Sequence, residues 1–273
     1  MPSPRPFVLH EANYRQLLDL KPNLAVLPWG ATEAHNFHLP YGTDNIEATA
    51  LGESAVAAAN ARGARCILLP TVPFGQDGAQ LSQVSTISLR ASTQAKILFD
   101  IADSLVRQGI DRLLILNFHG GNEFKSTLRD IMTDLPIFLV QASGFALAPR
   151  AKASLENAGD HADEFETSLL LHLTPDWVEM HHASDGATTT SKLPHLSNTP
   201  GVWAQRDWAA LSKDTGSGDP RRATAEKGAA ILAEAAENLA SVLVELSGAK
   251  DGDFPFVLPQ GKALKPLLSE GSE

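Results

Sequence analysis

Four short apolar runs alternate with longer segments of helical pattern along this chain. All four are apolar throughout, and they cover residues 23–30, 64–75, 111–121 and 136–143. A strand without polar alternation is typical of a sheet that is buried on both faces. The alternation of strands with helices therefore predicts an α/β fold with a mostly parallel central sheet covered on both faces.

The remaining segments are predicted to be helices and surface chain. Helical patterns cover residues 44–63, 92–109, 122–135, 162–173 and 221–247. Residues 84–90 alternate in polarity and are predicted to form a further strand, at an edge of the sheet. Residues 180–220 form a long excursion, of the kind that often serves as a lid or an oligomer contact. The chain after residue 250 is expected to be extended surface chain.

Composition limits the class of protein. The chain has 273 residues, 43% of them hydrophobic, and no break in composition, so we expect a single domain over residues 1–273. A net charge of −10 disfavours nucleic acid and anionic membranes as partners. One cysteine excludes a disulfide framework and fits a reducing cytoplasm. No signal peptide or transmembrane segment is recognisable, and a cytoplasmic protein with a small-molecule substrate is expected.

Potential metal ligands follow the predicted strands. Glu33 and His35 come directly after the first apolar run, His119 ends the third, and residues 160–165 precede a helix. Ligands bind at the carboxyl ends of parallel strands, so these side chains should meet at one edge of the sheet. His and carboxylate ligands without a thiolate suit zinc, manganese or iron. Asp44 could bridge two such ions, which would acidify a shared water and polarise a substrate carbonyl.

Other catalytic classes find no support in the sequence. There is no Gly-x-Ser-x-Gly motif of a serine hydrolase, no phosphate-binding loop and no dinucleotide fingerprint. Cys66 lies inside an apolar run and is expected to be a buried, inert thiol. Trp29 stands next to the ligands, where lining a pocket and packing in the core are equally open interpretations.

Four motifs resemble the signatures of the creatininase (creatinine amidohydrolase) family. They occur in the family's order and read LPWGATEAHNFHLPYGTD (27–44), LNFHGGN (116–122), DHADEFETS (160–168) and GDPRRATAEKG (218–228). The resemblance implies a three-layer α/β/α fold, a dinuclear metal site and a homohexamer. By motif position, Glu33 and His119 would bind one divalent ion and His35 the other, and Asp44 would bridge them.

The fifth ligand departs from the family pattern. Creatininase has a Glu two residues after the His of the second motif, where this chain has Gly121. Relatives with the His-Gly-Gly-Asn form carry a Glu three residues after the His of the third motif. The resemblance therefore implies Glu164 as the fifth ligand. Glu166 would then either orient a ligand or stabilise the start of its helix.

The substrate side departs further. His161 matches a His that resembles an acid/base group facing the substrate, so His161 and Glu164 are the predicted catalytic residues. The Trp-Asp pair with which creatininase holds its substrate is Asn157-Ala158 here. Creatininase activity itself is therefore not expected. The residues predicted to contact the substrate are Trp29, Phe37, Gly120 and Asp160.

The predicted function is a metal-dependent hydrolase with two divalent ions (Zn, Mn or Fe). It would open a C–N bond of a cyclic amide, a formamide or a small amide by attack of a metal-bridging hydroxide. Two alternatives stay open at this point. One is a hydrolase of a keto-inositol or another carbohydrate-derived ring with the same metal site. The other is a non-catalytic, metal-stabilised oligomeric binding protein, which the Gly at position 121 suggests.

Overall fold

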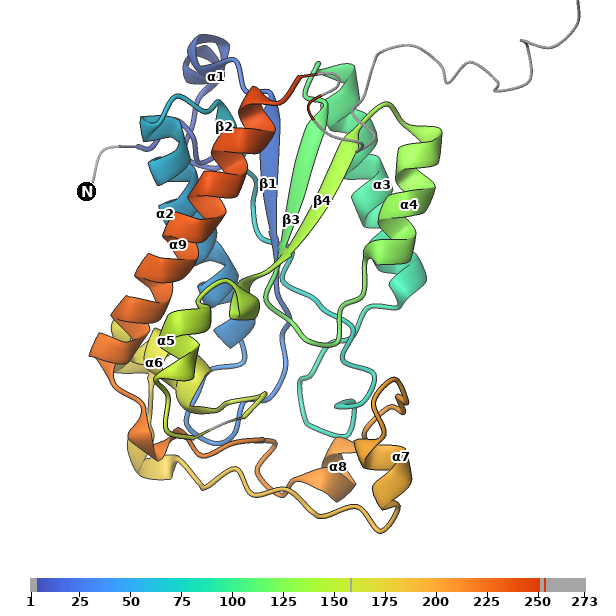
Figure 1. Ribbon diagram of the computed structural model, residues 1–273, viewed down its shortest axis with the longest axis vertical. Coiled ribbons are helices and arrows are strands. Elements are labelled where there is room, and N and C mark those ends of the chain that lie inside the picture. The colour runs from blue at the N-terminus through green and yellow to red at the C-terminus, as the bar shows by residue number, and fades with distance from the viewer. Residues whose placement is uncertain (1–3, 158, 251–252, 254–273) are drawn as a thin grey trace, which may run out of the picture.

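A parallel sheet forms the centre of the structure, a computed structural model that describes residues 4–157, 159–250 and 253 (Figure 1). The strand order is β2-β1-β3-β4, and all three neighbouring pairs run parallel. The strands are β1 (Leu24–Trp29), β2 (Cys66–Leu68), β3 (Arg112–Asn117) and β4 (Phe138–Ser143). The predicted parallel sheet is confirmed. The chain after residue 250 lies almost entirely outside the described residues.

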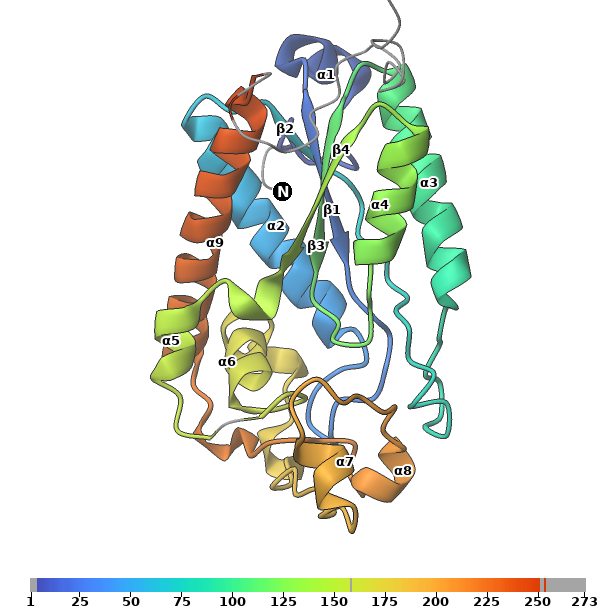
Figure 2. The ribbon, with the colours of Figure 1, turned by 45° about the vertical axis from the view of Figure 1, so that its right-hand side comes forward.

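Helices cover both faces of this sheet, which gives the three layers (Figures 1 and 2). On one face lie α2 (Thr43–Ala61), α6 (Glu164–Leu173) and α9 (Ala225–Gly248), and on the other α3 (Ala91–Arg107) and α4 (Lys125–Asp134). Shorter helices are α1 (Tyr14–Leu20), α5 (Pro149–Ala153), α7 (Pro194–Asn198) and α8 (Trp208–Leu211). None of the described helices has both the length and the apolar character that crossing a membrane would require.

The central strand β1 shows why its sequence is apolar throughout. Leu24 and Val26 point into the core shared with α2 and α9, whereas Ala25, Leu27 and Trp29 point into the core shared with α3 and α4. Successive side chains of a strand leave on opposite faces, so a strand between two helical layers needs apolar residues at every position.

Two strand predictions need correction. The run 64–75 forms only a three-residue strand, because Pro70 has no N–H to donate to a neighbouring strand. The run 84–90 is not a strand: only Ile87 makes a bridge, to Thr32, and Ser85 adopts a φ of 65°. Val84 is 80% exposed, so the polar–apolar alternation of this segment is not matched by a buried face.

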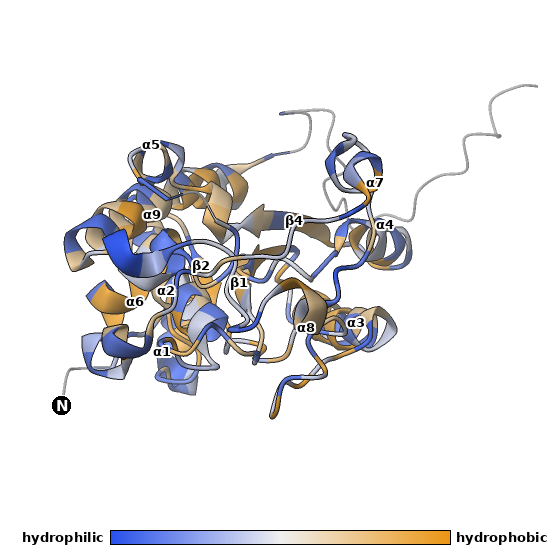
Figure 3. Cartoon of the chain, turned by 90° about the horizontal axis from the view of Figure 1, so that it is seen from below, coloured by the Kyte–Doolittle hydropathy of each residue, from blue (hydrophilic) through white to orange (hydrophobic). Residues whose placement is uncertain are grey.

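The excursion, residues 180–220, lies at the carboxyl end of the sheet. It carries α7 and α8 and is seen below the strands in Figure 1. Viewed from that end, it crosses in front of the sheet (Figure 3). The excursion therefore lies at the same end of the molecule as the predicted metal ligands.

Cys66, at the start of β2, offers a simple test of the core. The residue is fully buried, and this burial raises the pKa of its thiol to about 12. Because the thiolate is the reactive form, we expect a thiol reagent to leave the native protein unmodified at about pH 8. One thiol per chain should react after unfolding in guanidinium. Rapid reaction of the native protein would contradict the burial of Cys66.

Candidate metal centre

The predicted ligands meet at the carboxyl ends of β1 and β3. Glu33 and His35 lie in the loop that follows β1, and Asp44 lies in the first turn of α2. His119 comes two residues after the end of β3, and His161 lies just before α6. None of the five is more than 7% exposed. The structure thus brings together the side chains that were expected to meet at the carboxyl ends of the strands.

His35 presents one ring nitrogen to the cluster. Its Nδ1 lies 3.1 Å from the backbone carbonyl oxygen of Glu33, which can only accept a hydrogen bond. Nε2 faces inward, 2.8 Å from Oδ1 of Asp44. Burial lowers the pKa of His35, but the Asp44 carboxylate outweighs it and raises this pKa to about 10. A divalent ion bound here would take the place of the proton on Nε2.

His119 is oriented by a residue that the sequence analysis missed. Its Nε2 lies 2.8 Å from Oδ1 of Asp77, and its Nδ1 lies 2.9 Å from Glu33 Oε1 and 3.0 Å from Asp44 Oδ2. A carboxylate that accepts from one ring nitrogen directs the other toward a metal. Asp77 lies in the loop that follows β2 and Val72, a residue that forms a bridge with Trp29 of β1. Like Glu33, it therefore comes after a strand, at the edge of a parallel sheet where ligands are expected.

The structure does not bring Glu164 to the cluster, so the placement predicted for the fifth ligand is not met. Oε1 of Glu164 accepts a hydrogen bond from Lys227 Nζ at 2.5 Å. Its Oε2 accepts from the backbone N–H groups of Glu156 at 2.9 Å and of Asn157 at 2.7 Å. The carboxylate therefore joins α6 to α9 and to the chain that precedes α6.

Glu166 is the carboxylate of α6 that faces the cluster. Two residues of helix separate it from Glu164 by about 200° around the axis, so the two side chains leave on nearly opposite sides. Its Oε2 lies 3.9 Å from His35 Nε2 and accepts from the Ala162 N–H. Burial raises the pKa of Glu166 to about 8. Two roles were predicted for Glu166, orienting a ligand and stabilising the start of its helix. The position of Glu166 next to His35 favours the first.

Among the described residues, three groups of side chains could each hold a cation, with ligand atoms within 4.8 Å of one another. They are Glu33, His35 and His161; Glu33, Asp77 and His119; and His35, Asp44 and Glu166. Two of these groups share Glu33 and two share His35. The cluster is therefore continuous.

The cluster carries an excess of negative charge that bound cations would balance. Five carboxylates gather here, four of them buried and one, that of Glu166, partly buried. They belong to Glu33, Asp44, Glu47, Asp77 and Glu166, and among the described ion pairs none joins them to Lys or Arg. Both carboxylate oxygens of Glu47 are buried without a hydrogen-bond partner. Buried negative charge of this density requires compensation. With His nitrogens beside it, the cluster fits divalent ions such as zinc or manganese.

His161 is held as a neutral imidazole. Its Nε2 donates to the backbone carbonyl of Ala34 at 2.8 Å, and its Nδ1 faces Glu33 Oε1 at 3.9 Å. Burial, and then the neighbouring His35, hold the pKa of His161 well below its ordinary value. The Trp208 ring of α8 lies 4.9 Å from the His161 ring. His161 thus has a free lone pair on Nδ1, as a proton acceptor needs.

A second missed residue, Gln80, lies between His161 and a metal ligand. Its side-chain nitrogen donates to Glu33 Oε2 and lies 3.4 Å from His161 Nε2. Gln80 and Asp77 come from one loop, and Trp208 comes from the excursion. Only long-range folding brings these polar and aromatic groups to the signature residues, so no local pattern pointed to Gln80 or Trp208.

The residues predicted to contact a substrate are dispersed. Trp29 is fully buried, packs against Phe124 and donates from Nε1 to a backbone carbonyl, so it belongs to the core. Phe37 is 62% exposed, Gly120 is exposed, and Asp160 is paired with an arginine at the surface. For these last three, contact with a substrate stays a prediction.

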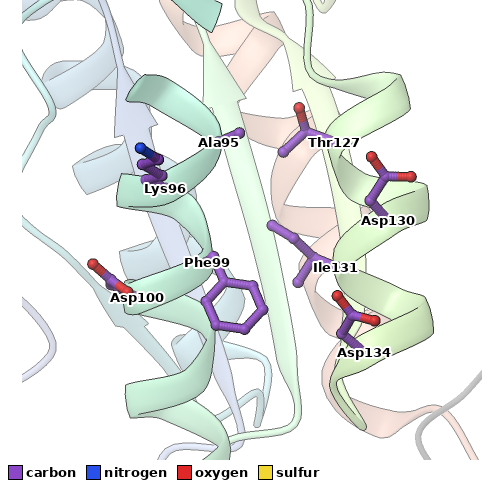
Figure 4. A pocket seen from close by; sticks show the side chains of 8 residues that line it. All are labelled: Ala95, Lys96, Phe99, Asp100, Thr127, Asp130, Ile131 and Asp134. Carbon is purple, nitrogen blue, oxygen red and sulfur yellow. The ribbon is translucent and has the colours of Figure 1, made fainter. Parts of the chain in front are cut away.

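A surface hollow between α3 and α4 is unrelated to this cluster (Figure 4). It has a volume of about 410 Å³ and is lined in part by Phe99, Ile131, Asp130 and Asp134. None of its lining residues belongs to the candidate metal centre.

Comparison with known proteins decides the family. The family model described as Creatininase (creatinine amidohydrolase) matches residues 10–243. The chain belongs to the creatininase family. It is 33% identical over 234 residues to the mycofactocin precursor peptide peptidase of Mycobacterium ulcerans (strain Agy99), covering 83% of this chain and 87% of that protein. It is 26% identical over 186 residues to the creatinine amidohydrolase of Pseudomonas putida, covering 60% of this chain and 70% of that protein.

Solved structures agree with this creatininase-family membership. A Bacteroides fragilis protein provisionally assigned as a creatinine amidohydrolase superposes with a TM-score of 0.84 at 36% identity, covering 92% of this chain and 99% of its own. A creatininase superposes at 0.72 and 21% identity, covering 89% and 99%, which shows the shared fold. Other solved creatininases include a zinc–zinc form of a variant and a manganese form.

These family relationships show a hydrolase of the creatininase family. The chain is more similar to the M. ulcerans peptidase than to the P. putida creatinine amidohydrolase, as expected of a family member that is not creatininase itself. The relatives are named as a peptidase and an amidohydrolase, so the non-catalytic alternative loses its support.

Proposed function

We propose that this creatininase-family hydrolase uses two divalent ions to cleave the C–N bond of an amide, with a peptide bond as the first substrate to test. The observation that carries the proposal is the position of Asp44. Its Oδ1 lies 2.8 Å from His35 Nε2, and its Oδ2 lies 3.0 Å from His119 Nδ1. One carboxylate thus faces the inward nitrogens of both histidines, as a bridging ligand would.

The residues divide naturally between two ions. Glu33, His119 and Asp44 would hold one ion, and His35, Asp44 and Glu166 the other, with zinc, manganese and iron all compatible with these donors. When bound, such ions acidify a shared water and polarise an amide carbonyl.

The protein's own groups supply orientation and proton transfer. Asp77 fixes the ring of His119, and the Glu33 carbonyl fixes the ring of His35. His161 keeps the proton on Nε2 bound to Ala34, so Nδ1 is the atom that accepts a proton and delivers it to the leaving nitrogen. The buried setting of these groups strengthens their electrostatic interactions.

Support for a peptide-type amide comes from two sides. The M. ulcerans relative is named a precursor peptide peptidase. The positions at which creatininase holds creatinine are Asn157 and Ala158 here. Cyclic amides and formamides contain the same type of C–N bond and remain in the proposed substrate class. A homohexamer and a cytoplasmic location stay predictions.

The proposal is tested with metal-free protein reloaded with Zn²⁺, Mn²⁺ or Fe²⁺. The substrate panel holds short peptides, formamides, lactams including creatinine, and a keto-inositol. We expect turnover of amides other than creatinine and about two ions per chain. Turnover of the keto-inositol alone would establish the carbohydrate-ring alternative, and turnover of no amide by the loaded protein would refute the proposal.

The pH dependence reports on His161. Because the low pKa keeps His161 neutral near neutral pH, kcat/KM should fall only below about pH 6.5, the ordinary imidazole value. His161→Ala should lower kcat at least about 100-fold without loss of metal. The readouts are a pH profile and metal analysis. An undiminished kcat in the variant would exclude His161 from proton transfer.

A further inference from the structure

Asn36 connects the first metal motif to the excursion. It lies between the ligand His35 and Phe37, is 7% exposed, and adopts a φ of 53°. Its backbone N–H donates to Thr215 Oγ1 at 2.9 Å. Its side-chain Oδ1 accepts from the Ser184 backbone N–H at 3.5 Å and lies 2.9 Å from Ser184 Oγ. Residues from both legs of the excursion therefore meet at one residue beside a metal ligand.

The two legs are also joined to each other. Ser184 Oγ hydrogen-bonds the Asp214 carboxylate, and Asp214 in turn accepts from Gly216 N–H at 2.8 Å. Further along, Thr189 N–H donates to the Leu211 carbonyl at 2.7 Å. These contacts close the base of the excursion and leave its outer part, around α7, exposed.

The closed base contacts His161 directly. Ser217 N–H donates to the His161 carbonyl at 2.8 Å, and the Asp160 N–H donates to the Ser217 carbonyl at 2.9 Å. From the same excursion, Trp208 lies against the His161 ring. The segment anchored at Asn36 thus borders the proton-transfer residue on two sides.

We propose that Asn36 is a positioning residue that holds the excursion against the metal centre, so that Trp208 and Ser217 frame His161 and the excursion walls the substrate site. This inference rests on the proposed hydrolase function for its kinetic part alone. Asn is suited to the role because it tolerates the left-handed backbone and its amide oxygen hydrogen-bonds locally.

The test compares Asn36→Gly with the native full-length protein loaded with Zn²⁺. Glycine adopts the same φ without strain, so the substitution removes only the amide. We expect KM for the best amide substrate to rise about tenfold, the effect of losing one or two net hydrogen bonds, with a smaller change in kcat. Trypsin cleavage after Lys192, in the exposed part of the excursion, should accelerate by a similar factor. Metal content should stay unchanged.

Two further variants complete the design. Ser184→Ala removes the hydroxyl next to Asn36 together with its hydrogen bond to Asp214, and it should also raise KM and accelerate trypsin cleavage. The double variant should change both by less than the sum of the two single effects, because Asn36 and Ser184 are in contact. Ser197→Ala removes an exposed hydroxyl of the same excursion for which no hydrogen bond is described, and as the matched control it should behave as the native protein.

The results separate this inference from the proposed function. Unchanged KM and unchanged cleavage in Asn36→Gly would overturn the positioning role, as would a loss of metal, which would place the effect at His35. If the native protein hydrolysed no amide, the proposed function would fall. The rate of trypsin cleavage would then test only whether Asn36 holds the excursion in place.

Discussion

Asp44→Ala is expected to abolish hydrolysis, with a loss of at least about 1000-fold in kcat/KM and of both metal ions. Both oxygens of Asp44 face histidines of the cluster, at 2.8 Å from His35 and 3.0 Å from His119. Removing a shared ligand weakens both sites at once, and each ion contributes several kcal/mol to the reaction. The measurements are metal content after gel filtration and the steady-state rate on the best amide substrate.

Asp176→Ala is the matched control for this substitution. Asp176 is exposed and makes no ion pair among those described, so its removal should leave metal content and rate unchanged. Retention of two ions per chain by Asp44→Ala would show that Asp44 bridges nothing. Loss of one ion only would assign it to a single site.

The second large effect distinguishes two glutamates of one helix. Glu166→Gln should release one ion and lower kcat/KM by about 100-fold or more, because Glu166 faces His35. Glu164→Gln should keep both ions but lower the melting temperature by about 5 °C, because it weakens the ion pair between the buried Glu164 carboxylate and the partly exposed Lys227. Metal analysis and thermal denaturation measure the two effects.

The pair of variants serves as its own control. Both residues lie in the first turn of α6, Glu164 buried and Glu166 partly buried. The opposite outcome, with metal lost from Glu164→Gln and retained in Glu166→Gln, would restore the assignment expected from the sequence resemblance. Loss of metal in both variants would point to a general disturbance of α6.

The strands of the sheet could be predicted from the sequence, because burial is visible in the local pattern of apolar residues. Each apolar run reports burial on both faces, so the sheet and its parallel sense followed from residues such as those of β1. The strand predicted at residues 84–90 was wrong, because polar and apolar side chains alternate there although neither face is buried. The length of β2 was overestimated, because Pro70 interrupts the pairing with β1, which resumes only as a single bridge at Val72.

From the sequence alone, the chemical character of the candidate site could be predicted. Glu33, His35, Asp44 and His119 follow or flank strands whose carboxyl ends must share one edge, and their atoms prefer divalent metals. Such placement depends on where the strands end, which the apolar runs indicate. The family motifs then narrowed the chemistry to a metal-dependent hydrolase.

Only the tertiary structure decided which neighbouring groups complete the centre. The choice between Glu164 and Glu166 depends on which side of α6 packs against Lys227 of α9, a contact across 63 residues. Gln80 and Trp208 reach His161 through folding alone. The physical reason is that local patterns fix burial along an element, whereas side-chain partners depend on how distant elements pack.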